Sequence, residues 1–458
     1  MMEMLSLNND KIIVLDYEYY NTYYNTANGR IINVPKDYLD YLEDYFQIND
    51  FFGIPNTGIC SIVTICINLT TKCNLRCKYC FNPKTVHHDL KLEDAINFID
   101  SIVSFKPHAS KYFVDLSGSG EPLLCLDKIL SIAKYCNKKQ DEIKKDIIVQ
   151  FATNGTLLTK EMAKILKEHK ILFGFSIDGY KELHDQYRVD INGNGTFDKI
   201  ISNYLNIENK DFIGCAMTFS DPNTDIYKAY LTMNEYFETI SIRPARMEYK
   251  DFRIDGILEG YKKITSYIIK DAMLNKSISL LKKIINGDDF FGKMIVKVAS
   301  NAYVNKRCDI GSSRFTIGAD GNTYLCSAFV FDEKGKVDFR KELKLNNDFC
   351  GACNLKNFCG GICSIQRLNY EDTSALCKLK EELFILAAKV CAEIELNDMD
   401  IYSLFVEEVS KVLLRNNEDL ELLEILENQK GKYSYSQLKE IKYTDEALYN
   451  ALKQNLNY

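Results

Sequence analysis

Short apolar runs alternate with amphipathic stretches between about residues 60 and 246. The runs are ICINLT, KYFVDLS, IIVQFAT, ILFGFSI, FIGCAMT and ETISIRP. The segments between them are long enough for crossover helices, for example LEDAINFIDSIVSF and KEMAKILKEH. Strands that alternate with helices are typical of a parallel sheet, either closed into a barrel or open. Six repeats predict an incomplete barrel, with chemistry at the carboxyl ends of its strands.

Residues 1–58 form a different pattern. KIIVLDYEYY and GRIINVP read as two short strands joined by an Asn-Gly turn, and PKDYLDYLEDYF reads as a helix opened by Pro35. The segment holds nine acidic residues, three basic residues and eight tyrosines. One interpretation is a small structural cap. The other is a peptide-docking module whose exposed strand edge accepts another strand.

The rest of the chain is helical on both sides of a cysteine-rich region. The expected fold is α/β: a partial (β/α)6 TIM-like barrel with a small N-terminal α+β module, a Cys-rich domain and a C-terminal helical extension. The Cys-rich region carries seven of the sixteen cysteines and short strands such as RFTIGADGNTYLC. The expected units are residues 1–58, 59–250, 251–300 (a helical bridge), 301–380 and 381–458.

Composition and charge exclude several classes of protein. Of the 458 residues 46% are hydrophobic and 26% charged, and no apolar run approaches the roughly 18 residues of a membrane span. The start MMEMLSLNND has no secretory pattern, so we expect a cytoplasmic protein in which cysteines serve as metal ligands or reactive thiols. The net charge of -7 without a basic stripe argues against nucleic acid as a partner.

The string TTKCNLRCKYCF places Cys73, Cys77 and Cys80 directly after the first strand of the expected barrel. Three thiolates at this spacing can ligate three irons of a cubane cluster and leave the fourth iron open for a substrate. A zinc site usually has four ligands in two pairs, and a bacterial ferredoxin run has another spacing. A chance group of buried cysteines is the remaining alternative. Arg76 and Lys78 would help to offset the negative charge.

At these residues the sequence resembles the radical S-adenosylmethionine (SAM) enzymes. The Cys73-x3-Cys77-x2-Cys80-Phe81 string is similar to their defining motif. The resemblance implies that SAM chelates the open iron, and that reduction releases a 5'-deoxyadenosyl radical which abstracts a hydrogen atom from a substrate. It also implies an electron donor such as flavodoxin or ferredoxin.

Shorter strings at later strand ends resemble SAM contacts of that family. They are SGSGEP at 117–122, TNG at 153–155, and SIDG at 176–179 followed by HDQYR. By this resemblance the SAM-binding residues are Tyr79, Gly120, Glu121, Asn154, Ser176, Asp178 and Arg188. Gly120 and Glu121 would hold the methionine amino group, and Tyr79 would offer backbone groups to the adenine. Ser119 stands where the family has a first glycine.

The later cysteines resemble the SPASM domain of peptide-modifying radical SAM enzymes. The resemblance implies two further [4Fe-4S] clusters, one held by Cys350, Cys353, Cys359 and Cys377, the other by Cys308, Cys326 and Cys363. One zinc ion on Cys350, Cys353, Cys359 and Cys363 is the alternative. The remaining cysteines, which sit mostly in apolar runs, are expected to be core thiols: Cys60, Cys66, Cys125, Cys136, Cys215 and Cys391.

The expected function is a radical SAM oxidoreductase that matures a ribosomally made precursor peptide, with its leader bound by the N-terminal module. Ser327 follows Cys326 where the sulfatase-maturing branch has an aspartate base, which disfavours formylglycine formation, and no histidine stands out as a general base. The favoured product is a cysteine thioether crosslink. Alternatives are a carbon-carbon or carbon-oxygen crosslink, protein-residue oxidation, dehydrogenation of a small molecule, or a zinc-stabilised binding protein.

The cluster of Cys308, Cys326 and Cys363 raises one further question. No cysteine occurs between Cys215 and Cys308, so one iron of that cluster lacks an expected protein ligand. One hypothesis is that a cysteine of the precursor binds this iron and is deprotonated there. The alternative is that water, Cys391 or another side chain fills the position.

Overall fold

The computed structural model describes most of the chain. The described residues are 2–7, 10–49, 51, 62–82, 87–247, 249, 252–304, 310–330, 333–339, 350, 352–361, 363 and 372–417. Cys308 and the residues after 417 lie outside them, as do residues 52–61 between the N-terminal segment and the barrel. Among the described helices, none is both long and apolar enough to cross a bilayer.

The N-terminal segment forms a four-stranded antiparallel sheet in the order β1-β2-β3-β4. Its strands are β1 (Met2–Leu7), β2 (Asp10–Asp16), β3 (Tyr20–Asn25) and β4 (Ile31–Pro35), followed by η1 (Lys36–Tyr41) and α1 (Leu42–Ile48). The Asn-Gly turn joins β3 to β4, with Gly29 at a φ of 83° that suits glycine. The sequence pattern found two of these strands and missed β1 and β3.

The main sheet has eight strands in the order β10-β9-β8-β7-β6-β5-β11-β12. Their bounds are β5 (Ile62–Ile67), β6 (Lys111–Asp115), β7 (Asp146–Thr153), β8 (Leu172–Ser176), β9 (Gly214–Phe219), β10 (Thr239–Pro244), β11 (Arg314–Ile317) and β12 (Thr323–Tyr324). Strands β5 to β10 are parallel and coincide with the six expected runs. The expectation of an α/β fold with a partial barrel is therefore confirmed.

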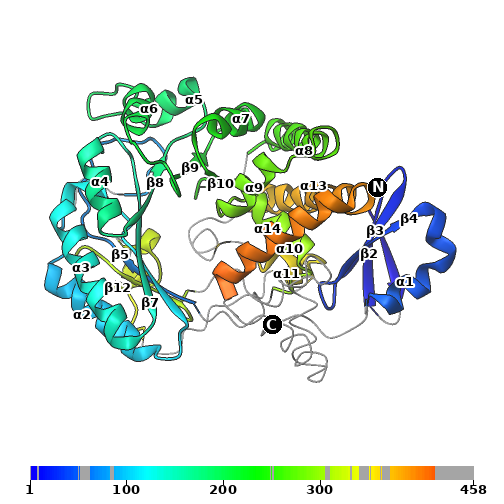
Figure 1. Cartoon of the computed structure of the whole chain (residues 1–458), viewed down its shortest axis with the longest axis horizontal. Helices are drawn as coiled ribbons and strands as arrows, with labels where there is room; N and C mark the ends of the chain where they lie inside the picture. Colours follow the sequence, from blue (N-terminus) through cyan, green and yellow to red (C-terminus); the bar gives the residue numbers. More distant parts are fainter. Residues whose placement is uncertain are drawn as a thin grey trace, which may run out of the picture.

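Helices cover one face of this sheet and extend beyond its β10 edge (Figure 1). The barrel helices are α2 (Leu92–Phe105), α3 (Leu126–Ile143), α4 (Lys160–Glu168), α5 (Lys181–Tyr187), α6 (Phe197–Leu205) and α7 (Ile226–Tyr236), with η2 (Pro122–Cys125) before α3. The later elements are α8 (Asp255–Asn275), α9 (Ser279–Asn286), α10 (Gly292–Ala299), η3 (Ser327–Phe329), η4 (Glu333–Gly335), α11 (Lys356–Cys359), α13 (Ser374–Asn397) and α14 (Met399–Asn417). Helix α13 crosses the boundary expected at residue 380.

The two faces of the parallel strands differ in burial. Along β7, Ile147, Val149 and Phe151 are buried in the main core, whereas Ile148 and Gln150 between them are half-buried on the opposite face. Alternate side chains of a strand point to opposite faces. The sheet therefore has an outer face packed on helices and an inner face that is more accessible.

The strands of the cysteine-rich region belong to the barrel sheet rather than to a separate one. Strand β11 pairs in parallel with β5, with Thr316 opposite Cys66. Beyond the strands, the amide N and Nδ2 of Asn68 both donate to the carbonyl of Ile317, at 3.0 and 2.9 Å. This long-range pairing fixes Cys326, which follows β12, close to the strand that leads into the three-cysteine loop.

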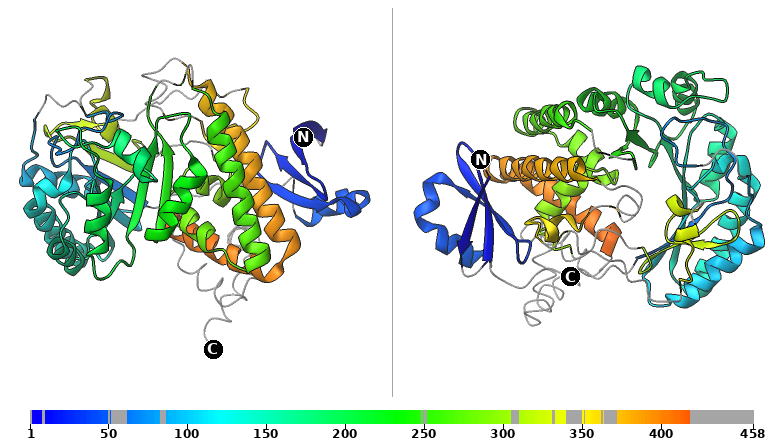
Figure 2. Two further views of the ribbon diagram at one scale, coloured as in Figure 1. Left: turned by 90° about the horizontal axis from the view of Figure 1, so that it is seen from above. Right: turned by 180° about the vertical axis from the view of Figure 1, so that it is seen from behind.

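The N-terminal sheet packs on the helical region, at the opposite end of the molecule from α2 and α3 (Figure 2). Tyr24 is fully buried and its ring lies edge-on to Phe384 of α13 and Phe358 of α11. The Tyr17 hydroxyl donates to the carbonyl of Ile385 at 2.9 Å. Several tyrosines of this segment thus serve as packing contacts, not as exposed surface.

Candidate functional site

The three cysteines of the TTKCNLRCKYCF string lie in one loop after β5. Burial raises the pKa of Cys73, and the charges of Glu121 and Cys80 raise it further. Burial raises the pKa of Cys77 to about 11, opposed by the Arg188 cation and reinforced by Cys80 and Cys73. The three thiols therefore influence one another through their charges, although among the described residues no three potential metal ligands are close enough to hold one metal ion. Cys80 is the exposed member of the group.

Backbone hydrogen bonds hold this loop against the segment after α5. The amide of Arg76 donates to the carbonyl of Val189 at 2.7 Å, and that of Lys78 donates to the carbonyl of Tyr187 at 2.9 Å. Nη1 of Arg76 donates to the carbonyls of Cys73 and Leu75, both at 2.8 Å. Arg76 therefore braces the loop backbone, and Arg188 is the cation that acts on the Cys77 thiol.

Glu121 is buried and links two strand ends. Its carboxylate accepts hydrogen bonds from the Thr153 hydroxyl at 2.6 Å, the Asn154 amide at 2.8 Å and the Leu123 amide at 3.1 Å. Burial raises the pKa of Glu121, and these donors oppose the rise. The carboxylate thus positions the TNG loop, and one oxygen, Oε2, retains capacity for a further donor.

Asn154 connects the TNG loop to the cysteine loop. Its Nδ2 donates to Oδ1 of Asn74 at 2.8 Å and lies 3.9 Å from Sγ of Cys73, which also accepts from the Leu75 amide at 3.4 Å. Gly120 has no room for a side chain, because a Cβ there would lie 2.4 Å from the carbonyl of Thr70. The strands β5, β6 and β7 thus present Gly120, Glu121 and Asn154 around Cys73.

Asp178 and Arg188 form a buried ion pair on the other side of the cysteine loop. Nε of Arg188 lies 2.9 Å from Oδ2 of Asp178, and the Tyr79 hydroxyl donates to the same oxygen. Oδ1 of Asp178 accepts from the Thr218 amide of β9 at 3.0 Å. The Arg188 guanidinium lies 5.5 Å from the centre of the Tyr79 ring. Tyr79 therefore contributes its side chain to the site, where the sequence suggested only its backbone.

His184, which the sequence did not single out, connects the two members of this pair. The Asp178 amide donates to Nδ1 of His184 at 3.0 Å, so this nitrogen is unprotonated. Nε2 then carries the proton and donates to Oγ1 of Thr196 at 3.0 Å, and that hydroxyl donates to the Arg188 carbonyl at 2.9 Å. Its place within HDQYR, four residues before Arg188, was the only available signal.

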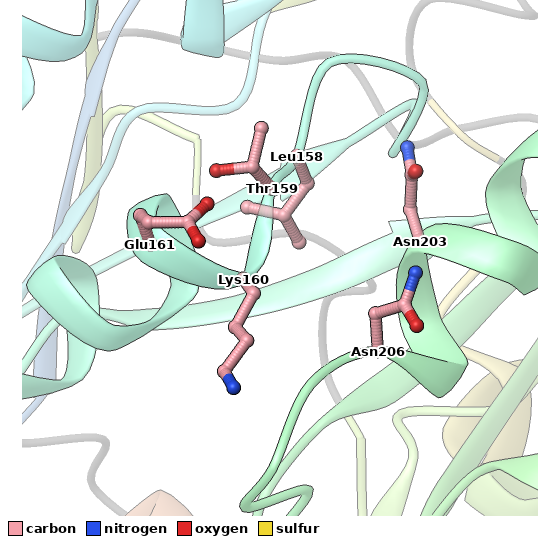
Figure 3. Close-up of a pocket in the computed structure, with 6 residues that line it drawn as sticks. All are labelled: Leu158, Thr159, Lys160, Glu161, Asn203 and Asn206. Carbon is pink, nitrogen blue, oxygen red and sulfur yellow. The ribbon is translucent and has the colours of Figure 1, made fainter.

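Ser176 lies at the carboxyl end of β8, half-buried on the inner face and opposite Ala216 of β9. Behind the TNG loop, Leu158, Thr159 and the start of α4 face α6 across a surface pocket of about 370 Å³ (Figure 3). Asn203 in its wall donates from Nδ2 to the carbonyls of Gly155 and Thr156, at 2.8 and 3.1 Å. Asn203 thus supports the TNG loop from the outer side of the sheet.

A second group of thiols lies between α11 and α13. The pKa of Cys377 is raised by burial, lowered by Lys380 and raised by the charges of Cys359, Cys350 and Cys353. Nζ of Lys380 donates to Sγ of Cys359 at 3.1 Å. The four cysteines that the sequence assigned to one cluster thus lie in one region, with a cation at Cys359, although in the described part of the chain no three potential metal ligands are close enough to hold one metal ion.

Cys326 and Cys363 both lie at a small apolar cluster. Both pack against Tyr324, Phe329 and neighbouring residues at the β12 end of the main sheet. Cys363 also packs against the main core, which includes Phe358 of α11 and Leu376 of α13. The third cysteine assigned to them, Cys308, is outside the described residues.

Comparisons with known proteins agree with this arrangement. Residues 67–222 match the family model described as "Radical SAM superfamily". Residues 67–222 are a radical SAM domain. The chain is therefore an enzyme that uses SAM and [4Fe-4S] clusters.

Known proteins are similar to a longer part of the chain than this domain. A "Cysteine-type anaerobic sulfatase-maturating enzyme" of Clostridium novyi (strain NT) is 26% identical over 310 residues, 63% of this chain and 79% of that protein. A solved structure described as "Native anSMEcpe with bound AdoMet" has a TM-score of 0.57 at 21% identity and covers 73% of this chain and 100% of the other. A second, with AdoMet and a Kp18Cys peptide, has a TM-score of 0.58 at 20% identity and covers 73% and 99%. The likeness to these structures establishes a shared fold.

The buried His184 predicts an acid-sensitive radical SAM domain. Burial and the Arg188 cation lower the pKa of His184 to about 3, from an ordinary value of 6.5. Below pH 6.5 the unfolded chain takes up a proton that the folded chain refuses, so stability falls as the pH drops toward 3. Between pH 7.5 and 5.5 the titration of His184 alone should lower the free energy of unfolding by about 1.4 kcal/mol.

The variant H184Q keeps one acceptor and one donor but does not titrate, so its stability should lose this part of the pH dependence. Thermal unfolding of both proteins across that pH range measures the effect. His169, whose Nδ1 lies 2.9 Å from the Ile165 carbonyl, gives the matched control H169Q. Equal pH dependence in wild type and H184Q would contradict a neutral His184.

Proposed function

We propose that this enzyme matures a ribosomally made precursor peptide. The observation that carries the proposal is the second group of four thiols, at Cys350, Cys353, Cys359 and Cys377, beside a radical SAM domain. Its relatives include sulfatase-maturating enzymes, and a similar fold occurs in a structure with a bound peptide. These resemblances support a peptide substrate.

The cysteines of the chain can be assigned to three clusters, one of which would bind SAM. Cys73, Cys77 and Cys80 would hold the SAM-binding cluster, the group with Cys350 a second, and Cys326 and Cys363 with Cys308 a third. When bound, the SAM-binding cluster would supply the electron that cleaves SAM to a 5'-deoxyadenosyl radical. The other clusters would accept an electron released by oxidation of the peptide. An electron donor such as flavodoxin or ferredoxin would reduce the enzyme.

The chain's own residues orient SAM. The free lone pair of Glu121 Oε2 and the Gly120 backbone lie beside the cysteine loop, where a methionine ammonium would find acceptors. Arg188 would attract the methionine carboxylate, and Asp178, Ser176 and Tyr79 lie at the neighbouring strand ends, where ribose and adenine would sit. Asn154 would steer Cys73 through its amide.

The favoured product is a thioether between a precursor cysteine and another residue of the same peptide. One hydrogen atom of the acceptor residue passes to the deoxyadenosyl radical, and the thiol loses a proton. Formation of the carbon-sulfur bond then releases one electron to a cluster. The peptide therefore loses two hydrogens overall. Ser327 offers no carboxylate base beside Cys326, which makes formylglycine formation the weaker alternative.

The N-terminal sheet is the proposed docking module for the leader of the precursor. Among the described strands none pairs with the outer edge of β1, and Met4 and Leu5 on it are each 42% exposed. A strand added there would gain backbone hydrogen bonds and apolar contacts. The excess of nine acidic over three basic residues favours a basic or amphipathic leader.

Replacement of Cys73, Cys77 and Cys80 by alanine should abolish release of 5'-deoxyadenosine, because no cluster remains to bind SAM. Of roughly twelve irons per chain about four should be lost. Chromatography of the reaction products and iron analysis after anaerobic reconstitution measure the two effects. If the triple variant still releases 5'-deoxyadenosine, the assigned SAM cluster is wrong.

Mass spectrometry of the precursor tests the product. Precursor incubated with enzyme, SAM and reductant should be lighter by two hydrogens and should have one fewer thiol that reacts with an alkylating reagent. Enzyme lacking Cys73, Cys77 and Cys80 serves as the control. The same mass loss with every thiol still reactive would replace the thioether by another crosslink or a desaturation.

The double variant M4K/L5K should weaken binding of the full-length precursor about tenfold, because lysines on an edge strand hinder strand addition and repel a basic leader. SAM cleavage without peptide should stay unchanged. The control Y41K adds a positive charge to the same module at a side chain that is 60% exposed and away from β1. Equal affinity of M4K/L5K and Y41K would refute docking at this edge.

A further inference from the structure

Arg243 lies on the inner face of the main sheet, near the carboxyl end of β10. Two other residues of this strand, Ile240 and Ile242, are fully buried in the main core. Because side chains alternate along a strand, Ser241 and Arg243 point to the opposite face. The hydrogen bond from Nε of Arg243 to Oγ of Ser241, at 2.9 Å, agrees with this placement. The strand therefore presents a cation to the interior of the partial barrel.

Strand pairing places Arg243 close to the proposed SAM site. Arg243 is opposite Thr218 of β9, and the Thr218 amide donates to Oδ1 of Asp178 at 3.0 Å. Two residues before Thr218, Ala216 pairs with Ser176 of β8. Two strand spacings, about 10 Å, separate β8 from β10, a distance that about three residues of extended peptide can span. A peptide whose reacting residue faces SAM can therefore reach Arg243.

The turn between α9 and α10 is fixed along the edge of β10. The Phe290 amide donates to the Ile242 carbonyl at 3.1 Å. The carboxylate of Asp289, which is fully buried, accepts from the Ile242 amide at 2.6 Å and from the Tyr230 hydroxyl at 2.9 Å. The preceding residue, Asp288, is therefore held at a fixed place beside the strand.

Asp288 pairs with two cations at this place. Its Oδ2 accepts from Nη2 of Arg243, and its Oδ1 is paired with Nζ of Lys293 in α10. The side chains of Arg243, Asp288 and Lys293 are 49%, 55% and 54% exposed. Ion pairs with this exposure contribute little to stability, so the fold does not depend on them. Two cations and one anion leave the group with a net charge of +1.

Arg243 retains hydrogen-bond donors for a ligand. Of its five N–H groups, Nε donates to the buried Ser241 and Nη2 donates to Asp288. Nη1 makes no hydrogen bond to any residue that the structure describes. The guanidinium is thus held in one orientation with free donors at one end. A fixed, planar guanidinium suits a carboxylate, which accepts two parallel hydrogen bonds.

We propose that Arg243 and Lys293 bind a carboxylate side chain of the precursor peptide, next to the residue that is modified. The inference rests on the proposed function, because it requires a peptide substrate, and it adds a substrate class. The core peptide carries Asp or Glu within about three residues of the modified position. Asp288 holds the two cations together while the site is empty. The core would thus differ in charge from the basic leader that the acidic N-terminal segment favours.

The test selects binders from a display library of random linear peptides on the reconstituted full-length enzyme with SAM. Wild type is compared with R243Q, R243K and K263Q. Lys263 is exposed on α8, so K263Q controls for the loss of one positive charge. The frequency of Asp and Glu in the selected peptides is measured against the input library. Equilibrium dialysis measures the affinity of each protein for SAM, whose methionine carboxylate is the other possible ligand.

Wild type and K263Q should enrich acidic residues about fivefold, the factor expected for a partly exposed ion pair. R243Q should lose this preference, and R243K should keep part of it, because lysine retains the charge but not the planar fork. Equal enrichment by wild type and R243Q would overturn the site. Weaker SAM binding by R243Q with the same peptide preference would assign the carboxylate to SAM and also overturn it.

Two further outcomes separate this inference from the proposed function. Selected peptides without any excess of acidic residues would overturn the carboxylate site and leave the peptide substrate in place. Failure of all four proteins to select any peptide would overturn the proposed function itself. If R243Q does not fold, as judged by its melting temperature, K293Q replaces it, and an unchanged preference in K293Q counts against the proposal.

Discussion

The buried ion pair of Asp178 and Arg188 is the interaction on which the proposed SAM site depends. A buried pair is stable only when its remaining donors and acceptors are satisfied, and removal of one partner typically costs 3–5 kcal/mol, roughly. Here Asp178 accepts from Tyr79 of the cysteine loop and from Thr218 of β9. The pair therefore couples the loop that holds the proposed cluster ligands to the strand ends that would hold the nucleoside.

His184 and Glu121 add hydrogen bonds on the two sides of the cysteine loop. His184 fixes the backbone at both Asp178 and Arg188 and does so as a neutral ring. On the other side of the loop Glu121 fixes the TNG segment, and Asn154 reaches Cys73 from there. Nε of Arg188 makes no hydrogen bond to a described residue beyond its ion pair with Asp178. The cysteine loop is held from both sides by buried polar groups, which would give a bound cluster a rigid position. Rigidity of this kind is what positions a short-lived radical relative to its target.

The sequence predicted those parts of the fold that depend on local patterns. Each parallel strand from β5 to β10 is a nearly continuous apolar run, as expected for strands that are covered by helices. The pairing of β11 with β5 has no local signal, because Thr316 and Cys66 are far apart in the chain and only four residues pair. Strands β1 and β3 were missed since tyrosine and asparagine in β3 obscure its alternation. The proposed cluster ligands rest on the spacing of the cysteines in the sequence.

Residues that act through others were harder to predict. His184 has an ordinary place on α5, and its role arises only when β8 and α6 bring Asp178 and Thr196 to its two nitrogens. Cys66 illustrates a different limit. Its apolar neighbours suggest a core thiol, yet the two faces of β5 meet different surroundings, and only the structure shows that the inner one holds Arg314 and Thr316.

The N-terminal sheet packs against the cysteine-rich region, so a leader docked on it would be held at a fixed place relative to that region. Tyr24 packs against Phe358, which precedes the proposed cluster ligand Cys359, and against Phe384 of α13, the helix that carries Cys377. Asn33 reaches the same helix through Glu395. A leader bound at β1 is therefore attached to a body that is continuous with the cysteine-rich region. The core peptide beyond the leader would start from a fixed point and not from a freely moving module, so its reach toward the barrel would depend on the length of its own linker.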